Sequence, residues 1–306
     1  MKDGQASQTA IWVCMARALA HGRTSVARFS DPTALTLLPD AARTKVEATH
    51  SASDSPSFRE RLRQSMWQAR AGMMVARTVE IDDAIRAVAH PQLVILGAGL
   101  DGRAWRMPEL RDTIVFEVDH PDSQRTKRAR ISTLTQTARE VRFVPVDFTR
   151  DSLDDALTQV GHDPSLPTTW VWEGVIMYLT PAEIESTLAV ITRRSTRPSR
   201  LIIVYLAPAL MMHIVGIFVR RVGEPFRSSY TAAALRDLLA DHGFAVHRDE
   251  NIRSIATSLL PELGKTTRRI KHLRVATADR LPAATQQRNA DRSGSGNERK
   301  ALNFIL

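Results

Sequence analysis

The segment with the clearest chemical potential is a glycine-rich turn, GAGLDG at residues 97–102, which follows an apolar run at residues 93–96. Small residues let the backbone turn sharply at the end of a strand and approach a ligand closely. Acids follow at Glu117 and Asp119, 20 and 22 positions after Gly97. A carboxylate there could accept hydrogen bonds from a ribose diol. This spacing favours a nucleotide-binding site over a turn that serves only strand-to-helix packing.

Two further polar sites follow later apolar runs. Asp147 and Phe148 come directly after the run at residues 141–146. This pair could bind the adenine amino group and cover the base, or it could be a helix-capping acid next to a core ring. Glu173 lies within the run TWVWEGVIMYL. A carboxylate among such apolar neighbours needs a partner, which makes Glu173 a site candidate.

The glycine turn is compatible with two classes of cofactor, dinucleotides and S-adenosylmethionine (SAM). A pyrophosphate needs a helix N-terminus that offers free N–H groups. Asp101 lies inside the turn, and its negative charge would oppose a pyrophosphate. SAM has no phosphate and carries a sulfonium cation, so an acid nearby is acceptable. The turn therefore favours SAM, with an NAD(P)-dependent oxidoreductase as the alternative.

Strands that alternate with helices of about a dozen residues must position these groups, and this pattern predicts an α/β fold with a doubly wound, mostly parallel sheet. The predicted strands are 93–96, 113–118, 141–146, 169–172, 201–206 and one that begins at 244–247. The predicted helices between and after them are 121–138, 151–160, 181–194 and 231–242. Helices predicted at 8–22, 58–75 and 78–89, with a loop and helix at 31–50, precede the sheet. We expect an N-terminal helical cap at 1–90 and a SAM-binding core at 91–275, with an inserted cap segment at 208–230.

The charge of the chain is concentrated at one end. The 306 residues carry 42 Lys and Arg and 33 Asp and Glu, a net charge of +9. Residues 265–306 hold ten of the bases and three of the acids, so they carry +7 and residues 1–264 carry +2. We therefore expect no specific nucleic-acid surface on the body of the protein. The Gly/Ser-rich residues 282–306 are expected to form a disordered basic tail.

The only cysteine, Cys14, excludes an internal disulfide and a cysteine-based zinc site, and it fits a reducing compartment such as the cytoplasm. The sequence indicates no metal site. Residues 201–219 contain no acid, lysine or arginine and resemble a membrane span in hydropathy. Pro208 divides them into a β-type half and a second half that contains His213, so we expect a buried strand followed by a covering helix. A non-catalytic SAM-binding or membrane-associated protein is a third alternative.

Four motifs in order make the sequence similar to a known family. The runs VILGAGLDGRAWRM, VFEVDHPDSQRTKRAR, FVPVDF and WVWEGVIMYLTPAEI resemble the leucine carboxyl methyltransferase-like family of SAM-dependent O-methyltransferases. The resemblance extends from about residue 9 to about residue 253. It implies a class I, Rossmann-like methyltransferase fold, SAM as cofactor and S-adenosylhomocysteine (SAH) as product.

The resemblance assigns roles to matching residues. It implies that Arg77, before the first strand, pairs with the methionine carboxylate of SAM. Without the resemblance, Arg77 would be interpreted as a surface helix residue. Gly97 and Gly99 would pass beneath the amino-acid part of SAM. Asp119, in the EVDHP run, would hold the ribose.

The later motifs add four positions. Asp147 and Phe148 match an Asp-Leu pair that contacts adenine, and Glu173 matches an acid beside the methionine moiety. Tyr178 matches a tyrosine near the methyl-transfer region, although it could equally be an ordinary, partly buried aromatic residue. Gly102 departs from the family, which usually has Thr or Ser there.

The expected reaction is the transfer of a methyl group to a carboxyl or hydroxyl oxygen, with a small-molecule acceptor favoured over a protein C-terminus. A carboxylate acceptor is already nucleophilic at neutral pH, whereas a hydroxyl needs a base within reach. We assign no catalytic base from the sequence. Substrate choice should lie in the cap, which is the least informative part of the chain.

Overall fold

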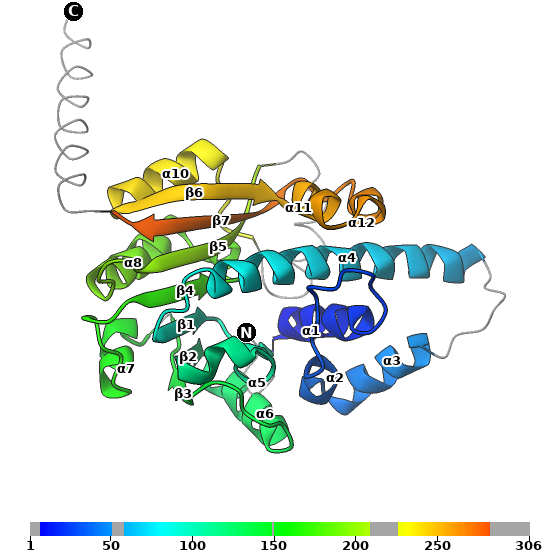
Figure 1. Ribbon diagram of the computed structural model, residues 1–306, viewed down its shortest axis with the longest axis horizontal. Coiled ribbons are helices and arrows are strands. Elements are labelled where there is room, and N and C mark those ends of the chain that lie inside the picture. Colours follow the sequence, from blue (N-terminus) through cyan, green and yellow to red (C-terminus); the bar gives the residue numbers. More distant parts are fainter. Residues whose placement is uncertain (1–6, 51–57, 149, 209–225, 282–306) are drawn as a thin grey trace, which may run out of the picture.

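The computed structural model describes residues 7–50, 58–148, 150–208 and 226–281, and their centre is one seven-stranded sheet (Figure 1). Its strand order is β3-β2-β1-β4-β5-β7-β6. The five strands β1 to β5 are parallel, whereas β7 runs antiparallel to both of its neighbours. The strands are β1 Gln92–Leu96, β2 Ile114–Asp119, β3 Glu140–Pro145, β4 Thr168–Trp172, β5 Arg200–Leu206, β6 Phe244–Asn251 and β7 Leu273–Arg280. The prediction of a mostly parallel α/β sheet is confirmed.

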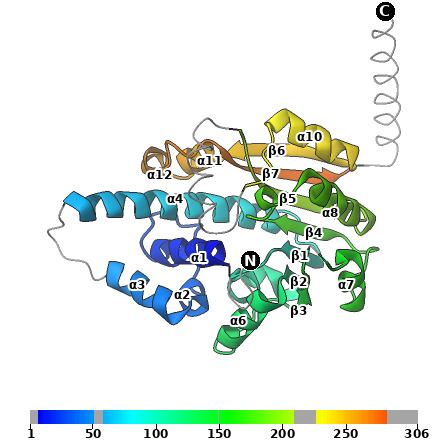
Figure 2. The same cartoon turned by 180° about the vertical axis from the view of Figure 1, so that it is seen from behind.

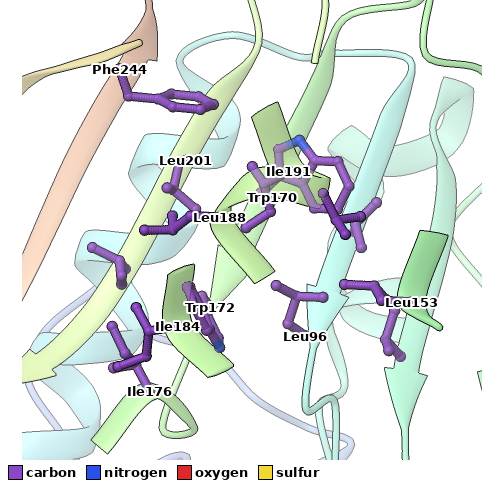
Figure 3. Packing of buried hydrophobic residues seen from close by; sticks show 14 of the residues in the cluster. Leu96, Leu153, Trp170, Trp172, Ile176, Ile184, Leu188, Ile191, Leu201 and Phe244 are labelled. Atoms are coloured by element: carbon purple, nitrogen blue, oxygen red, sulfur yellow. The ribbon is translucent and has the colours of Figure 1, made fainter. Parts of the chain in front are cut away.

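Both faces of the sheet are buried, which explains why the central strands are uninterrupted apolar runs. Every residue of β1, β4 and β5 is buried. Successive side chains point to opposite faces, so Leu96 and Trp172 belong to one core cluster and Ile95 and Val171 to the other. Figure 3 shows the first cluster, in which the two strand tryptophans pack among aliphatic side chains.

Two groups of helices cover these faces (Figures 1 and 2). Helices α7 Leu153–Gln159, α8 Pro181–Arg193 and α10 Ala232–Asp241 contribute to the first cluster. Helices α4 Phe58–Arg86, α5 Arg103–Arg106 and α11 Ile252–Leu259 contribute to the second. The remaining elements of this part are α6 Pro121–Ile131, α12 Pro261–Thr266 and the short 3-10 turns Pro108–Asp112 and Ile176–Tyr178. The start of α8 has a capping box between Thr180 and Glu183, as its sequence indicates.

The N-terminal helices form a separate layer at the edge where the parallel strands end. Helices α1 Gln8–Ala20, α2 Ala34–Leu37 and α3 Asp40–His50 lie together at that end, and the long helix α4 runs beside them (Figures 1 and 2). They enclose a small apolar core that includes Cys14, Leu37 and Val46. Leu100 from the glycine turn also packs into this core. The cap and the turn are therefore one packed unit.

The structure corrects several predicted boundaries. Helix α4 is continuous where two helices were predicted, because neither proline nor glycine interrupts residues 76–77. The predicted core boundary at residue 275 falls inside β7, a strand that the sequence analysis missed together with α11 and α12. Of the predicted cap segment 208–230, residues 209–225 lie outside the described residues, as does the predicted tail 282–306. No helix in the described part of the chain has both the length and the hydropathy to cross a membrane.

Candidate functional site

A cavity of about 470 Å³ lies at the edge of the sheet where the parallel strands end. Its walls come from the glycine turn after β1, from the ends of β2 and β4, and from α1 and α4. Strand order reverses between β1 and β4, and the crevice at such a reversal is where open α/β sheets bind ligands. Six of the predicted site residues line this cavity: Arg77, Gly97, Gly99, Asp119, Glu173 and Tyr178.

The glycine turn has a conformation that larger residues resist. Gly97 and Gly99 have φ angles of +68° and +48°, in the left-handed region. A Cβ atom on Gly97 would lie 2.2 Å from Cγ2 of Val175. The amides of Gly97 and Ala98 both donate to the carbonyl of Val118, at 2.8 and 3.0 Å. This anchoring holds the turn tightly against the end of β2.

Asp119 is fixed by backbone amides on one side and lines the cavity on the other. Its Oδ2 accepts from the amide of Gly99, and its Oδ1 accepts from the amide of His120 at 2.6 Å. Burial raises the pKa of Asp119, and these two hydrogen bonds oppose that shift. A carboxylate has about four lone-pair sites, so Asp119 can accept further hydrogen bonds from a ligand in the cavity.

Arg77 and Glu173 form a buried ion pair in the wall of the cavity, with 2.6 Å between Nε and Oε1. The other oxygen of Glu173 lies 2.9 Å from Nη1 of Arg103. Burial acts to raise the pKa of Glu173, but Arg77 and Arg103 outweigh it and hold this pKa below its usual value. Glu173 therefore remains ionised although it is buried. Arg77 and Arg103 are thus the partners that a carboxylate with such apolar sequence neighbours needs.

These residues belong to a larger network that we call the buried charge cluster. Its eight members, four acids and four arginines, are Asp31, Asp82, Asp101, Glu173, Arg17, Arg77, Arg103 and Arg106. Arg103 is central, since it contacts Asp82 at 2.8 Å as well as Asp101 and Glu173. Arg106 continues the network to Asp82 at 2.6 Å. The cluster is electrically balanced, which is what allows so many charges to be buried.

Asp101 does not act as the sequence analysis supposed. Arg103 and Arg17 compensate its charge and, against the effect of burial, hold its pKa well below the usual range. The repulsion that we invoked against a pyrophosphate is thus absent. The packing beside Asp101 also explains why position 102 is a glycine, because a Cβ atom on Gly102 would lie 2.0 Å from Oγ1 of Thr33. The family's usual Thr or Ser would collide with the cap of this protein.

The two acids at the end of β2 have different surroundings. Asp119 lines the cavity, whereas Glu117 lies behind it and pairs with Lys127, whose Nζ is 2.6 Å from both carboxylate oxygens. Burial raises the pKa of Glu117 to about 7, although Lys127 opposes the shift. Lys127 also lies over the ring of Trp105, 4.9 Å from its centre. Glu117 is therefore a structural group beneath the site.

Asp147 and Phe148 are not among the residues that line the cavity. The carboxylate of Asp147 lies 3.9 Å from Nε of Arg150, and its amide donates to Asp151 at 2.8 Å. Phe148 packs against the first core cluster. Phe148 thus matches the core ring that we considered as an alternative, whereas the next helix, α7, is capped by Ser152 and not by Asp147. Their contact with adenine stays a prediction.

The part of the cavity next to β5 and β7 has a different character. Tyr178 and Phe226 stack there, with ring centres 5.6 Å apart and an interplanar angle of 25°. Leu206, Leu273 and His272 complete this wall. His272 was not predicted as a site residue, because β7 was not predicted as a strand. An apolar run that alternates with polar residues at 273–280 would have been the signal.

Comparisons with known proteins show the family of the chain. The profile of the leucine carboxyl methyltransferase family matches residues 10–192. A protein of Mycobacterium sp. (strain JLS), provisionally named as a SAM-dependent methyltransferase, is 32% identical over 234 residues, which cover 76% of each chain. A protein of Frankia alni with the same provisional name is 34% identical over 197 residues, which cover 63% of this chain and 66% of that protein.

Among solved structures, a DUF574 family protein from Streptomyces avermitilis has a TM-score of 0.55 at 14% identity, and the match covers 92% of this chain and 99% of that chain. At this level of identity the likeness concerns the fold alone. The family profile and the mycobacterial relative go further. The chain belongs to the leucine carboxyl methyltransferase family of SAM-dependent methyltransferases.

Proposed function

We propose that the protein is an O-methyltransferase that binds SAM in the 470 Å³ cavity and transfers its methyl group to an oxygen of a small metabolite. The observation that carries this proposal is that one cavity brings together the glycine turn, Asp119 and the Arg77–Glu173 pair. Its volume is within the range of about 300–1,000 Å³ that is typical of small-molecule sites.

The residues present fit SAM. Gly97 and Gly99 line the cavity in left-handed conformations, so the backbone itself forms the surface along which the amino-acid part would pass. Asp119 would accept hydrogen bonds from the ribose hydroxyls. Arg77 contacts Glu173 through Nε, and its remaining N–H groups can bind a carboxylate. Asp147 and Phe148 would take the adenine at the rim of the site.

The buried charge cluster suits the amino-acid part of SAM in particular. That part is a zwitterion, and the cluster offers Glu173 to an ammonium and Arg77 to a carboxylate. Bound SAM supplies an electrophilic methyl group on a sulfonium. The protein then needs mainly to align the acceptor oxygen and to exclude water. Helices α1 to α4 would do both as a cap. The single thiol of Cys14, buried and unbridged, suits a cytoplasmic enzyme.

Ligand binding tests the proposal directly. Isothermal titration with SAM, SAH, NAD and NADP should give binding for the first two alone, and SAM and SAH should raise the melting temperature. Stabilisation by NAD without stabilisation by SAM or SAH would refute the proposal. Metabolite extracts incubated with tritiated-methyl SAM should then yield a labelled product. A base-labile label marks a methyl ester, and a base-stable label marks a methyl ether.

A further inference from the structure

The cavity extends across the sheet edge from the end of β2 to the start of β7. Strand β7 is antiparallel, so its first residues lie at the same edge as the last residues of the parallel strands. Leu273 pairs with Leu206, and the carbonyl of His272 accepts from the amide of Ala207 at 2.7 Å. Three strand spacings separate β1 from β7, which is roughly 14 Å. The start of β7 thus lies well away from the glycine turn.

This distant wall, which we call the acceptor wall, consists of Tyr178, Leu206, Phe226, His272 and Leu273. Among the described residues it includes no acid, lysine or arginine. The two arginines of the cavity, Arg17 and Arg77, are paired with Asp31 and Glu173 in the buried charge cluster.

A carboxylate placed at the acceptor wall would lose its hydration without gaining a counterion from the described residues, which is costly. A neutral hydroxyl needs only a hydrogen-bond partner. Among the described residues of this wall, His272 has the ring that could both accept its hydrogen bond and take its proton. No hydrogen bond to its imidazole forms within the described part of the chain.

We propose that the methyl acceptor is a phenol, that its ring packs against Tyr178 and Phe226, and that His272 is the base that takes its proton; this inference rests on the proposed function. Stacked aromatic side chains are a favourable surface for a further aromatic ring. Phenols have a pKa of about 10, which is close enough to that of an imidazole for general-base catalysis.

The step balances as a displacement. The phenol oxygen forms a bond to the methyl carbon while the bond between that carbon and sulfur breaks. The electron pair of the broken bond stays on sulfur and leaves neutral SAH. The phenol proton passes to the unprotonated imidazole nitrogen of His272, which releases it to water. No other reactant is needed.

The surroundings of His272 keep its imidazole neutral. Burial alone lowers its pKa. Lys271 precedes it and is exposed, and Arg274 on β7 is paired with Asp249 at 2.9 Å. From neighbouring elements, α11 contributes the exposed Arg253. On α4, Arg77 is paired with Glu173, and Tyr178 is stacked on Phe226. A neutral imidazole is the form that can accept a proton.

Matched acceptors and His272 variants test the inference. A panel of simple phenols, each paired with the benzoate of the same ring, would be incubated with the whole protein and tritiated-methyl SAM. We expect a base-stable label on phenols and none on benzoates. With His272→Ala, kcat/KM for the best phenol should fall roughly 10²–10⁴-fold. Added imidazole should restore part of this loss, and the acidic limb of the pH profile should disappear in His272→Gln.

Two controls separate this inference from the proposed function. SAH affinity, measured by calorimetry, should be unchanged in His272→Ala, because only the backbone of His272 joins β5. His247→Ala, on the exposed side of β6, should keep full activity. Wild-type protein that fails to bind SAH would overturn the proposed function. Wild-type protein that binds SAH but labels benzoates or no phenol, or His272→Ala that keeps its activity, would overturn this inference alone.

Discussion

The two ends of the cavity are built in different ways. The end over β1, β2 and β4 is surrounded by fixed charges that already satisfy one another, with Arg103 joining three acids. The end over β5 and β7 is the acceptor wall, held by the contact of apolar and aromatic side chains such as Tyr178 and Phe226. Charge networks need defined positions, whereas apolar walls tolerate changes of shape. This contrast fits a constant cofactor at one end and a variable acceptor at the other.

The contrast gives each end its own sensitivity to mutation. The buried charge cluster is balanced, so removal of one member leaves an unpaired charge in the interior. The acceptor wall contains no such pairs among the described residues, and changes there cost only contact area.

Replacement of the central arginine should have the largest effect. Arg103→Met leaves Asp82, Asp101 and Glu173 without their common partner, and we expect a loss of about 3–5 kcal/mol in the free energy of unfolding. Urea denaturation measures it. Arg111→Met, at an exposed arginine that pairs only with exposed Asp112, should change stability by less than about 0.5 kcal/mol. Equal losses in the free energy of unfolding of the two variants would show that the buried charge cluster stabilises the fold no more than an exposed ion pair does.

The pair beneath the site should make stability depend on pH. The pKa of Glu117 is raised from 4.5 to about 7 when the protein folds, so the folded state holds this proton more tightly than the unfolded chain. Its contribution is full below pH 4.5 and is lost as pH rises to about 7. Relative to the double variant Glu117→Gln/Lys127→Met, the wild type should therefore lose roughly 3 kcal/mol over this range.

Urea titrations at several pH values measure that difference. Glu262→Gln, at an exposed acid of α12, should keep the wild-type pH dependence. If the free energy of unfolding varies with pH in the same way in the wild type and the double variant, Glu117 stays ionised beside Lys127.

The glycine turn should be sensitive to a single methyl group. Gly97→Ala places a Cβ atom against Val175 and keeps an unfavourable φ, so the turn must shift and SAH affinity should fall at least about tenfold. Calorimetry measures this. Gly22→Ala has the same type of φ but nothing within 4 Å of its Cβ, so it should leave SAH affinity unchanged. Wild-type affinity in Gly97→Ala would place SAM elsewhere.

The acceptor wall should give the smallest effect. Phe226→Leu removes one ring of the stack with Tyr178, and we expect a loss of about 1 kcal/mol in stability with SAH affinity within twofold of wild type. Thermal unfolding and calorimetry measure the two quantities. Tyr178→Phe keeps both rings and should be nearer to wild type in stability. A large loss of SAH affinity in Phe226→Leu would contradict the division of the cavity into two ends.

The sequence was informative where function coincides with a regular pattern. Gly97, Asp119 and Glu173 directly follow or end apolar strands, and parallel strands bring such positions to one edge. The family resemblance added Arg77, which no periodicity could have selected. The fold was predictable through β5 for the same reason, because buried parallel strands have unmistakable apolar runs.

Long-range partnerships were not predictable. Nothing in the sequence links Asp82 to Arg103, or Arg17 to Asp31, since each pair forms only after distant elements have packed. His272 escaped notice because β7 has an alternating, Thr- and Arg-containing sequence that a single pass does not separate from a loop. Asp101 was assigned the wrong effect because its compensating arginines were unknown.

The antiparallel pairing of β7 with β5 also means that the sheet is completed late in protein synthesis. A ribosome delivers β5 long before β7, so the nascent sheet presents one side of β5, a mostly apolar strand, as an unpaired edge. Such an edge invites pairing with other chains while synthesis continues. The growing chain would carry the proposed cofactor end of the cavity almost complete before the acceptor wall exists. The arrival of β7 both pairs the exposed edge of β5 and completes the cavity.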